Sequence, residues 1–189
     1  MGQALTDKNV VVAISGLHGV GKTSQAKKLA ISFGLRHVSG GMIFRDLAKL
    51  KGISLVSLSN AAEKSNEIDH LIDNRMVEEG RKGNVIIDSM LCAWFLRDIA
   101  HVKIFLSASE RVRIARIASR DKVSYQEAYS ETLARESSEM NRFKRYYNLT
   151  IEDVKSSCDL VLSTDDLEEG EVFSILKYYV QLRISKLGL

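Results

Sequence analysis

Residues 16–23 combine residue types and a spacing that suit the binding of a phosphate chain. They read Gly-Leu-His-Gly-Val-Gly-Lys-Thr, which matches the pattern Gly-x-x-x-x-Gly-Lys-Ser/Thr between an apolar run and a helical pattern. The glycines let the backbone curl so that successive amide hydrogens point at phosphate oxygens, and the positive end of the following helix attracts the same anion. In such a loop Lys22 can bridge the β- and γ-phosphates, and the Thr23 hydroxyl can bind Mg2+. We therefore predict a P-loop that binds ATP with Mg2+. The residues expected to contact the triphosphate are Gly16, His18, Gly19, Val20, Gly21, Lys22, Thr23 and Ser24.

Two side chains at this site have two interpretations each. His18 stands at a variable position of the loop, where it can contact phosphate, although a solvent-facing side chain is the preferred interpretation. Asp88 ends a second apolar run and can orient Mg2+ through water, as acidic residues do at that place in P-loop folds. The alternative for Asp88 is a helix N-cap or a turn residue at the end of a strand.

Arginines recur at helical spacing between residues 109 and 146. Arg135 and Arg142 are two helical turns apart, so both project from one face with Glu139 between them. A second stripe consists of Arg113, Arg116 and Arg120. The planar guanidinium makes bidentate bonds to phosphate, so the stripes can supply cations to one phosphate cluster. The alternative is a solvated helix face with surface ion pairs such as Glu131 with Arg135.

Short apolar, β-branched runs alternate along the chain with longer segments of helical period. The runs are residues 10–15, 35–39, 84–88, 102–107 and 159–163. The helical patterns cover residues 22–33, 43–51, 66–82, 91–98, 109–120, 124–146 and 167–187. Strands that are apolar on both faces and separated by helices indicate a parallel sheet covered on both sides. Right-handed crossovers make this an open, doubly wound, five-stranded α/β fold, whose ligands bind beyond the carboxyl ends of the strands.

The segment 109–146 departs from this alternation. Its two helical patterns are joined by residues 121–123 without an intervening strand. We expect an inserted helical hairpin that projects from the sheet.

Length and charge bound the remaining possibilities. A chain of 189 residues supports one well-buried core. The net charge of +3 suits an anionic ligand, but the basic residues lack the aromatic neighbours typical of RNA binding, so no nucleic-acid partner is expected.

The first eight residues are polar and unlike a signal peptide, and the run 10–14 is too short to cross a membrane. Cys92 and Cys158 have no metal-ligand spacing, so we predict a cytoplasmic protein in which both are buried.

Five stretches of the chain, taken in order, resemble the nucleoside monophosphate kinases, and among them the archaeal cytidylate kinases. They are ISGLHGVGKT at 14–23, SGGMIFR at 39–45, NEIDHLIDNR at 66–75, KIFLSA at 103–108 and RESSEMNRF at 135–143. With the matching lengths between them, these stretches cover nearly the whole chain after residue 9. The P-loop is shared by many families, whereas the Gly-x-Ile-Phe-Arg stretch and the late arginine pair are more selective.

The resemblance implies ATP-dependent phosphorylation of CMP and dCMP, and it implies roles for the matched positions. Arg45 would hold the acceptor phosphate, and Arg135 and Arg142 would belong to a mobile lid. The implied catalytic residues are Lys22, Arg45, Arg135 and Arg142. The implied acceptor-binding residues are Ser39, Gly41, Arg45, Asp88 and Glu139. Thr23 and Asp88 would hold Mg2+, the latter through water, and residues 163–165 would border the adenine.

The resemblance also implies one P-loop kinase domain over residues 1–189, expected to act as a monomer. Its parts would be a core of about 9–39, 83–108 and 158–189, an acceptor-binding arm of about 40–82, and a helical lid of about 121–146. Within the arm, Asp69, Asp73 and Arg75 share one helix; Arg75 can contact the acceptor or pair with a neighbouring acid.

Two positions depart from the pattern of these kinases. Met90 stands where the relatives usually carry an arginine that contacts the acceptor, and Met42 stands where they often carry an aspartate. Two other functions therefore remain open: a kinase for AMP or another small acceptor, and a non-catalytic ATP-binding regulatory module.

Overall fold

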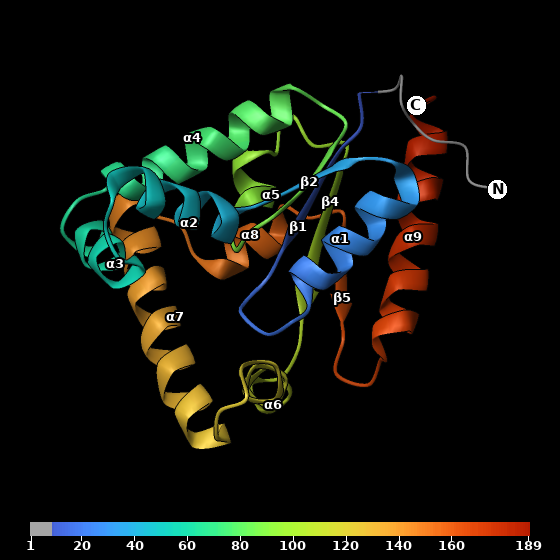
Figure 1. The fold of residues 1–189 in the computed structure, drawn as a ribbon. Coiled ribbons are helices and arrows are strands. Elements are labelled where there is room, and N and C mark those ends of the chain that lie inside the picture. Colours follow the sequence, from blue (N-terminus) through green and yellow to red (C-terminus); the bar gives the residue numbers. More distant parts are fainter. Residues whose placement is uncertain (1–8) are drawn as a thin grey trace.

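A computed structural model describes residues 9–189 as a five-stranded sheet with helices on both faces (Figure 1). The strands are β1 (Val11–Ser15), β2 (Arg36–Ser39), β3 (Val85–Asp88), β4 (Val102–Ser107) and β5 (Leu160–Ser163). Their order is β2-β3-β1-β4-β5, and every neighbouring pair is parallel. The predicted doubly wound α/β fold is confirmed.

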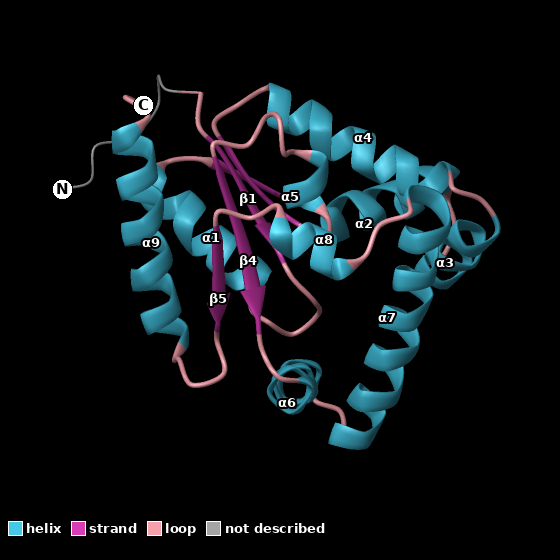
Figure 2. Ribbon diagram, turned by 180° about the vertical axis from the view of Figure 1, so that it is seen from behind, coloured by secondary structure: helices cyan, strands magenta, loops and turns pink. Residues whose placement is uncertain are grey.

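The helices fill the connections between the strands. They are α1 (Lys22–Phe33), α2 (Gly40–Lys51), α3 (Leu55–Lys64), α4 (Glu67–Arg81), α5 (Cys92–Phe95), α6 (Glu110–Asp121), α7 (Tyr125–Tyr147), α8 (Ile151–Ser156) and α9 (Glu169–Lys186). Successive side chains of a strand point to opposite faces, so Val12 and Ile14 pack with α1 and α9, whereas Val11 and Ala13 pack with α4, α5 and α8. Figure 2 shows these two helical layers on either side of the sheet.

Four helices differ from the periodicity, and one of them is α5, which ends at Phe95 although its pattern continues to residue 98. α3 and α8 were not predicted, because both are short and rest on caps: Ser54 accepts a hydrogen bond from the amide of Ser57, and Thr150 forms a capping box with Asp153. α2 begins at Gly40 rather than residue 43, since the Ser39 side chain caps it despite two glycines of low helix propensity.

The P-loop packs tightly against the carboxyl ends of its neighbours. Gly16 has φ +144°, and a Cβ there would lie 2.2 Å from the carbonyl oxygen of Leu106 in β4. A Cβ on Gly19 would lie 2.6 Å from the carbonyl oxygen of Arg113 in α6. Only glycine allows this approach, which places the loop between the end of the sheet and α6.

The helices α6 and α7 form the expected hairpin beyond the carboxyl ends of the strands (Figure 1). The later part of α7 packs against α3: Ser138 donates a hydrogen bond to Glu63 at 2.8 Å, and the Tyr146 hydroxyl donates one to the carbonyl oxygen of Ala62 at 3.1 Å. The hairpin therefore joins the P-loop side of the molecule to the arm built from α2, α3 and α4.

Other sequence-based expectations have mixed outcomes. Cys92 is buried as expected, but Cys158 is only partly buried. Trp94 and Phe95 pack against the core on the α5 side. Within residues 9–189, none of the helices combines the length and the apolar character needed to span a bilayer. The expectation for residues 1–8 lies outside the described residues.

Candidate active site

One cleft of about 1100 Å³ runs from the P-loop to α4 and is bounded by α6 and α7. It is lined by nearly all the residues that the sequence singled out: His18, Gly19, Val20, Gly21, Lys22, Thr23, Ser24, Ser39, Gly41, Arg45, Asp88, Arg135, Glu139 and Arg142. Gly16 does not line the cleft, because it lies against the end of β4. The fold thus brings the expected donor and acceptor residues into one cavity.

Lys22 begins α1 and lies over its own loop. Its Nζ donates a hydrogen bond to the carbonyl oxygen of Leu17 at 2.6 Å. Burial lowers the pKa of Lys22 to about 8, although the charge of Asp88 opposes the shift. A buried ammonium of this kind is favourable beside an anion such as phosphate.

Asp88 is held from two sides at the end of β3. The Thr23 hydroxyl donates to its Oδ2 at 2.7 Å, and Nε2 of His37 lies 2.6 Å from its Oδ1. A hydroxyl and a fixed carboxylate are the oxygen ligands that Mg2+ takes in proteins, so this pair fits the metal. Asp88 caps no helix here, which removes the N-cap interpretation. His37 was missed because its neighbour β3 lies some fifty residues further along the chain.

The acceptor side is formed where β2 runs into α2. The Ser39 hydroxyl accepts a hydrogen bond from the amide of Met42 at 3.0 Å, and a Cβ on Gly41 would lie 3.4 Å from Nη1 of Arg45. The Arg45 guanidinium therefore lies over the first turn of α2. Met42 is partly exposed, whereas Met90 is buried and forms part of the cleft wall.

The two arginines of α7 lie in the cleft but have carboxylate partners. Nε of Arg142 donates to Asp69 at 2.8 Å, and Nε of Arg135 donates to Glu139 at 3.1 Å. Nε2 of His18 lies 2.7 Å from the same Glu139. The preferred interpretation of His18 as solvent-facing is therefore wrong: it contacts α7, and burial lowers its pKa despite the acid beside it.

The second arginine stripe divides: Arg116 and Arg120 line the cleft, whereas Arg113 does not. Arg113 is buried, donates to Glu136 (Nη2 to Oε2, 3.2 Å) and donates to the carbonyl oxygen of His18 at 2.9 Å. Glu136 in turn accepts the amide of His18 at 3.2 Å. This ion pair ties both helices of the hairpin to the P-loop. Sequence reasoning missed Glu136, although its position three residues before Glu139 places it on the same helix face.

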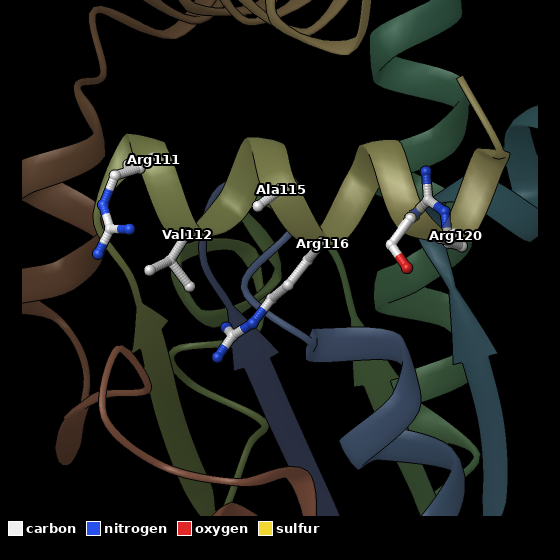
Figure 3. A pocket seen from close by; sticks show the side chains of 6 residues that line it. Arg111, Val112, Ala115, Arg116 and Arg120 are labelled. Atoms are coloured by element: carbon white, nitrogen blue, oxygen red, sulfur yellow. The ribbon is translucent and has the colours of Figure 1, made fainter. Parts of the chain in front are cut away.

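Arg116 and Arg120 have separate partners. Arg116 donates to Thr164 Oγ1 at 2.8 Å and to its carbonyl oxygen at 2.6 Å, which joins α6 to the segment after β5. Arg120 pairs with the exposed Asp121 at 2.7 Å. Figure 3 shows Arg111, Arg116 and Arg120 following one another along α6, beside a groove of about 490 Å³. On α4, Arg75 likewise pairs with Glu78 and Glu79.

Comparison with known proteins places this geometry in a family. The cytidylate kinase-like family model matches residues 11–166. Cytidylate kinase from Staphylothermus marinus is 43% identical over 172 residues, which cover 91% of this chain and 97% of that protein. Cytidylate kinase from Ignicoccus hospitalis is 44% identical over 154 residues, which cover 82% and 89%.

Solved structures give the same fold at low identity. Shikimate kinase from Bacteroides thetaiotaomicron has a TM-score of 0.62 at 15% identity, with 95% of this chain and 99% of that chain covered. Shikimate kinase from Aquifex aeolicus has a TM-score of 0.57 at 15% identity, with 95% and 100% covered. These neighbours show the fold, and the sequence relatives show the family: the chain belongs to the cytidylate kinase-like family.

Proposed function

We propose that this protein transfers the γ-phosphoryl group of ATP to CMP or dCMP and so forms CDP or dCDP. The observation that carries the proposal is the single cleft in which the P-loop faces Arg45, Arg135 and Arg142. Relatives that match over most of their length are named cytidylate kinases, which supports a cytidine monophosphate as the acceptor.

The P-loop side is suited to the donor. Its backbone amides and the start of α1 attract the phosphates, and the Lys22 ammonium can replace its bond to Leu17 with one to a phosphate oxygen. Thr23 and Asp88 are the residues that would hold Mg2+, with His37 fixing the carboxylate. Bound Mg2+ would neutralise charge that develops on the phosphates during transfer.

The opposite side supplies cations for the acceptor and for the travelling group. Arg45 comes from the arm, and Arg135 and Arg142 come from α7. Phosphoryl transfer needs positioning and positive charge more than covalent help from the protein. Because both arginines of α7 already face carboxylates, we infer that nucleotide phosphates compete with Glu139 and Asp69 for them.

We further propose that the enzyme acts as a cytoplasmic monomer. The cleft is lined by the P-loop, the arm and the hairpin of one chain, so the reaction needs no residue from a second copy. Light scattering at working concentration measures the mass directly.

The test is an acceptor panel with ATP and Mg2+, in which CMP, dCMP, UMP, AMP and GMP are compared by kcat/KM. We expect CMP or dCMP to be preferred, and we expect Lys22→Ala and Arg142→Ala each to lower kcat/KM at least about 100-fold. Lys28→Ala is the matched control, since Lys28 lies on α1 outside the cleft and pairs with Glu169. Tight ATP binding without turnover of any monophosphate would contradict the proposal.

One observation keeps AMP or another small acceptor as a second candidate. Met90 gives the cleft an apolar wall at the position where the resemblance to the cytidylate kinases implies an arginine. The same acceptor panel on Met90→Arg separates CMP from AMP as the acceptor. An increase in kcat/KM for CMP alone would indicate that the added charge serves CMP.

A further inference from the structure

Gln25 lies on α1, three residues after Lys22, and its amide is only half satisfied. Only 2% of the residue is exposed. Its Nε2 donates a hydrogen bond to the carbonyl oxygen of Glu169, the first residue of α9, at 2.9 Å. Its Oε1 is buried and has no hydrogen-bond partner among residues 9–189. Buried polar atoms are nearly always paired, so this oxygen indicates a partner that the chain itself does not supply.

The contact with Glu169 fixes which end of the Gln25 amide is free. If the amide were flipped, Oε1 would face the Glu169 carbonyl oxygen, and two acceptors would lie 2.9 Å apart without a proton between them. The amide therefore keeps its donor on Glu169 and its acceptor unpaired. A ligand atom that pairs with Gln25 must be a hydrogen-bond donor.

The end of the cleft that Gln25 lines lies across the molecule from the arm. Leu167, Glu169 and Val172 line it after β5 and on α9, and Ile117 lines it from α6. Figure 1 shows α9 and the arm at opposite edges of the molecule. Apolar side chains around one polar atom suit a flat aromatic base, whose faces are apolar and whose edge carries hydrogen-bonding groups.

The P-loop decides which nucleotide reaches this end of the cleft. Lys22 begins α1, and Gln25 lies about one turn further along the same helix. We expect the triphosphate at Lys22 and the acceptor phosphate at Arg45, which belongs to the arm. The base near Gln25 is therefore that of the donor, because the acceptor lies on the other side of the phosphates.

We propose that Gln25 selects the donor base: its Oε1 accepts a hydrogen bond from the exocyclic amine of adenine, and the protein so favours ATP over triphosphates with a carbonyl at that position. This inference rests on the ATP binding that belongs to the proposed function. Purine bases are nearly equal in size, but position 6 carries an amine donor in adenine and a carbonyl acceptor in guanine. Hypoxanthine, the base of ITP, has the same carbonyl without the second amine of guanine. Such a carbonyl would set two acceptors against each other and leave the buried Gln25 oxygen unpaired.

The experiment measures calorimetric Kd values of ATP and ITP, each with Mg2+ and without an acceptor, on the wild type and on Gln25→Met. We expect the wild type to bind ATP about 10- to 100-fold more tightly than ITP, because an unpaired buried acceptor is costly. In Gln25→Met the ratio should fall below about 3-fold, since methionine has a similar length and no acceptor of this strength. Gln181→Met makes the same change on the exposed side of α9 and should retain the wild-type ratio.

The ratio of the two Kd values separates base selection from a structural role of Gln25. Loss of the contact with Glu169 alone would weaken ATP and ITP by the same factor, so an unchanged ratio in Gln25→Met overturns the inference. Equal binding of ATP and ITP by the wild type also overturns it. If the wild type binds ATP but turns over no monophosphate, the proposed transfer fails, while the ratio still decides base selection. Gln25→Leu takes the place of Gln25→Met if thermal melting shows that the methionine variant does not fold.

Discussion

Asp73 carries a stability cost that depends on pH, because its carboxyl is buried beside Asp69 without a cation of its own. Its pKa rises from 3.8 in a model peptide to about 7 in the fold, so the folded state binds the proton more tightly than the unfolded state. The stability that the protonated Asp73 carboxyl contributes is therefore fully present below about pH 4. It is lost as the pH rises through about 7, where the carboxyl ionises in the folded state.

Asp73→Asn removes this titration. We expect the free energy of unfolding of the variant, relative to wild type, to increase by about 2–3 kcal/mol between pH 5 and pH 8. Urea denaturation at both pH values measures the difference, and the Tyr147 hydroxyl retains an acceptor in the amide. If the difference in free energy of unfolding between the variant and the wild type stays constant, or falls as the pH rises, the fold does not raise the pKa of Asp73.

Among the elements, the α6–α7 hairpin is fastened to the P-loop by one buried ion pair. Arg113 bridges Glu136 and the carbonyl oxygen of His18, and only 4% and 2% of the two ionic residues are exposed. The small cluster of Ile114, Ile117 and Ala128 packs α6 on α7. The Arg113–Glu136 pair therefore joins α6 to α7 and also holds the P-loop, and the apolar cluster adds to the contact between the two helices.

Breaking this pair should destabilise the protein strongly. Arg113→Met leaves the Glu136 charge buried without its cation, which costs about 3–5 kcal/mol. The double variant Arg113→Met with Glu136→Leu should recover much of the loss, because neither charge is then stranded. Urea denaturation of the singles and the double measures the coupling. Arg120→Ala removes an exposed pair with Asp121 and should change stability by less than about 1 kcal/mol. Equal effects of Arg113→Met and Arg120→Ala would contradict this account.

On the scale of the whole molecule, the cleft joins three parts that are distant in sequence: the P-loop, the arm of α2 to α4, and the hairpin. The arm and α7 meet through Arg142 with Asp69, Tyr147 with Asp73, and Ser138 with Glu63. We expect a nucleotide that binds in the cleft to contact all three parts and so to stabilise the folded chain as one unit.

A non-hydrolysable ATP analogue at 100 times its Kd should add about 2.7 kcal/mol to the free energy of unfolding. Thermal melting over a range of analogue concentrations measures this gain, with Mg2+ held constant. Lys22→Ala should show a much smaller gain at the same analogue concentration, because we propose that the Lys22 ammonium contacts the phosphates. A wild-type melting temperature that does not respond to the analogue would contradict donor binding at the P-loop.

The sequence by itself determined the strands, most of the helices and the donor loop. All five strands end where their apolar runs end, and residues 16–23 are recognised as a P-loop because the motif is continuous in the chain. Local patterns of this kind depend on neighbours a few residues apart, which is also why the short, cap-dependent α3 and α8 were missed.

Only the tertiary structure decided which polar groups face each other. His37 meets Asp88 across 51 residues, His18 meets Glu139 across 121, and Tyr147 meets Asp73 across 74. Each of these contacts exists because strand order and helix packing bring distant segments together, and no periodicity within one segment encodes such a partner. The arginines also combine a local and a tertiary part. Their spacing predicted that they share one face of a helix, but only the packing of the helices placed Arg135 and Arg142 in the cleft and paired Arg113 with Glu136.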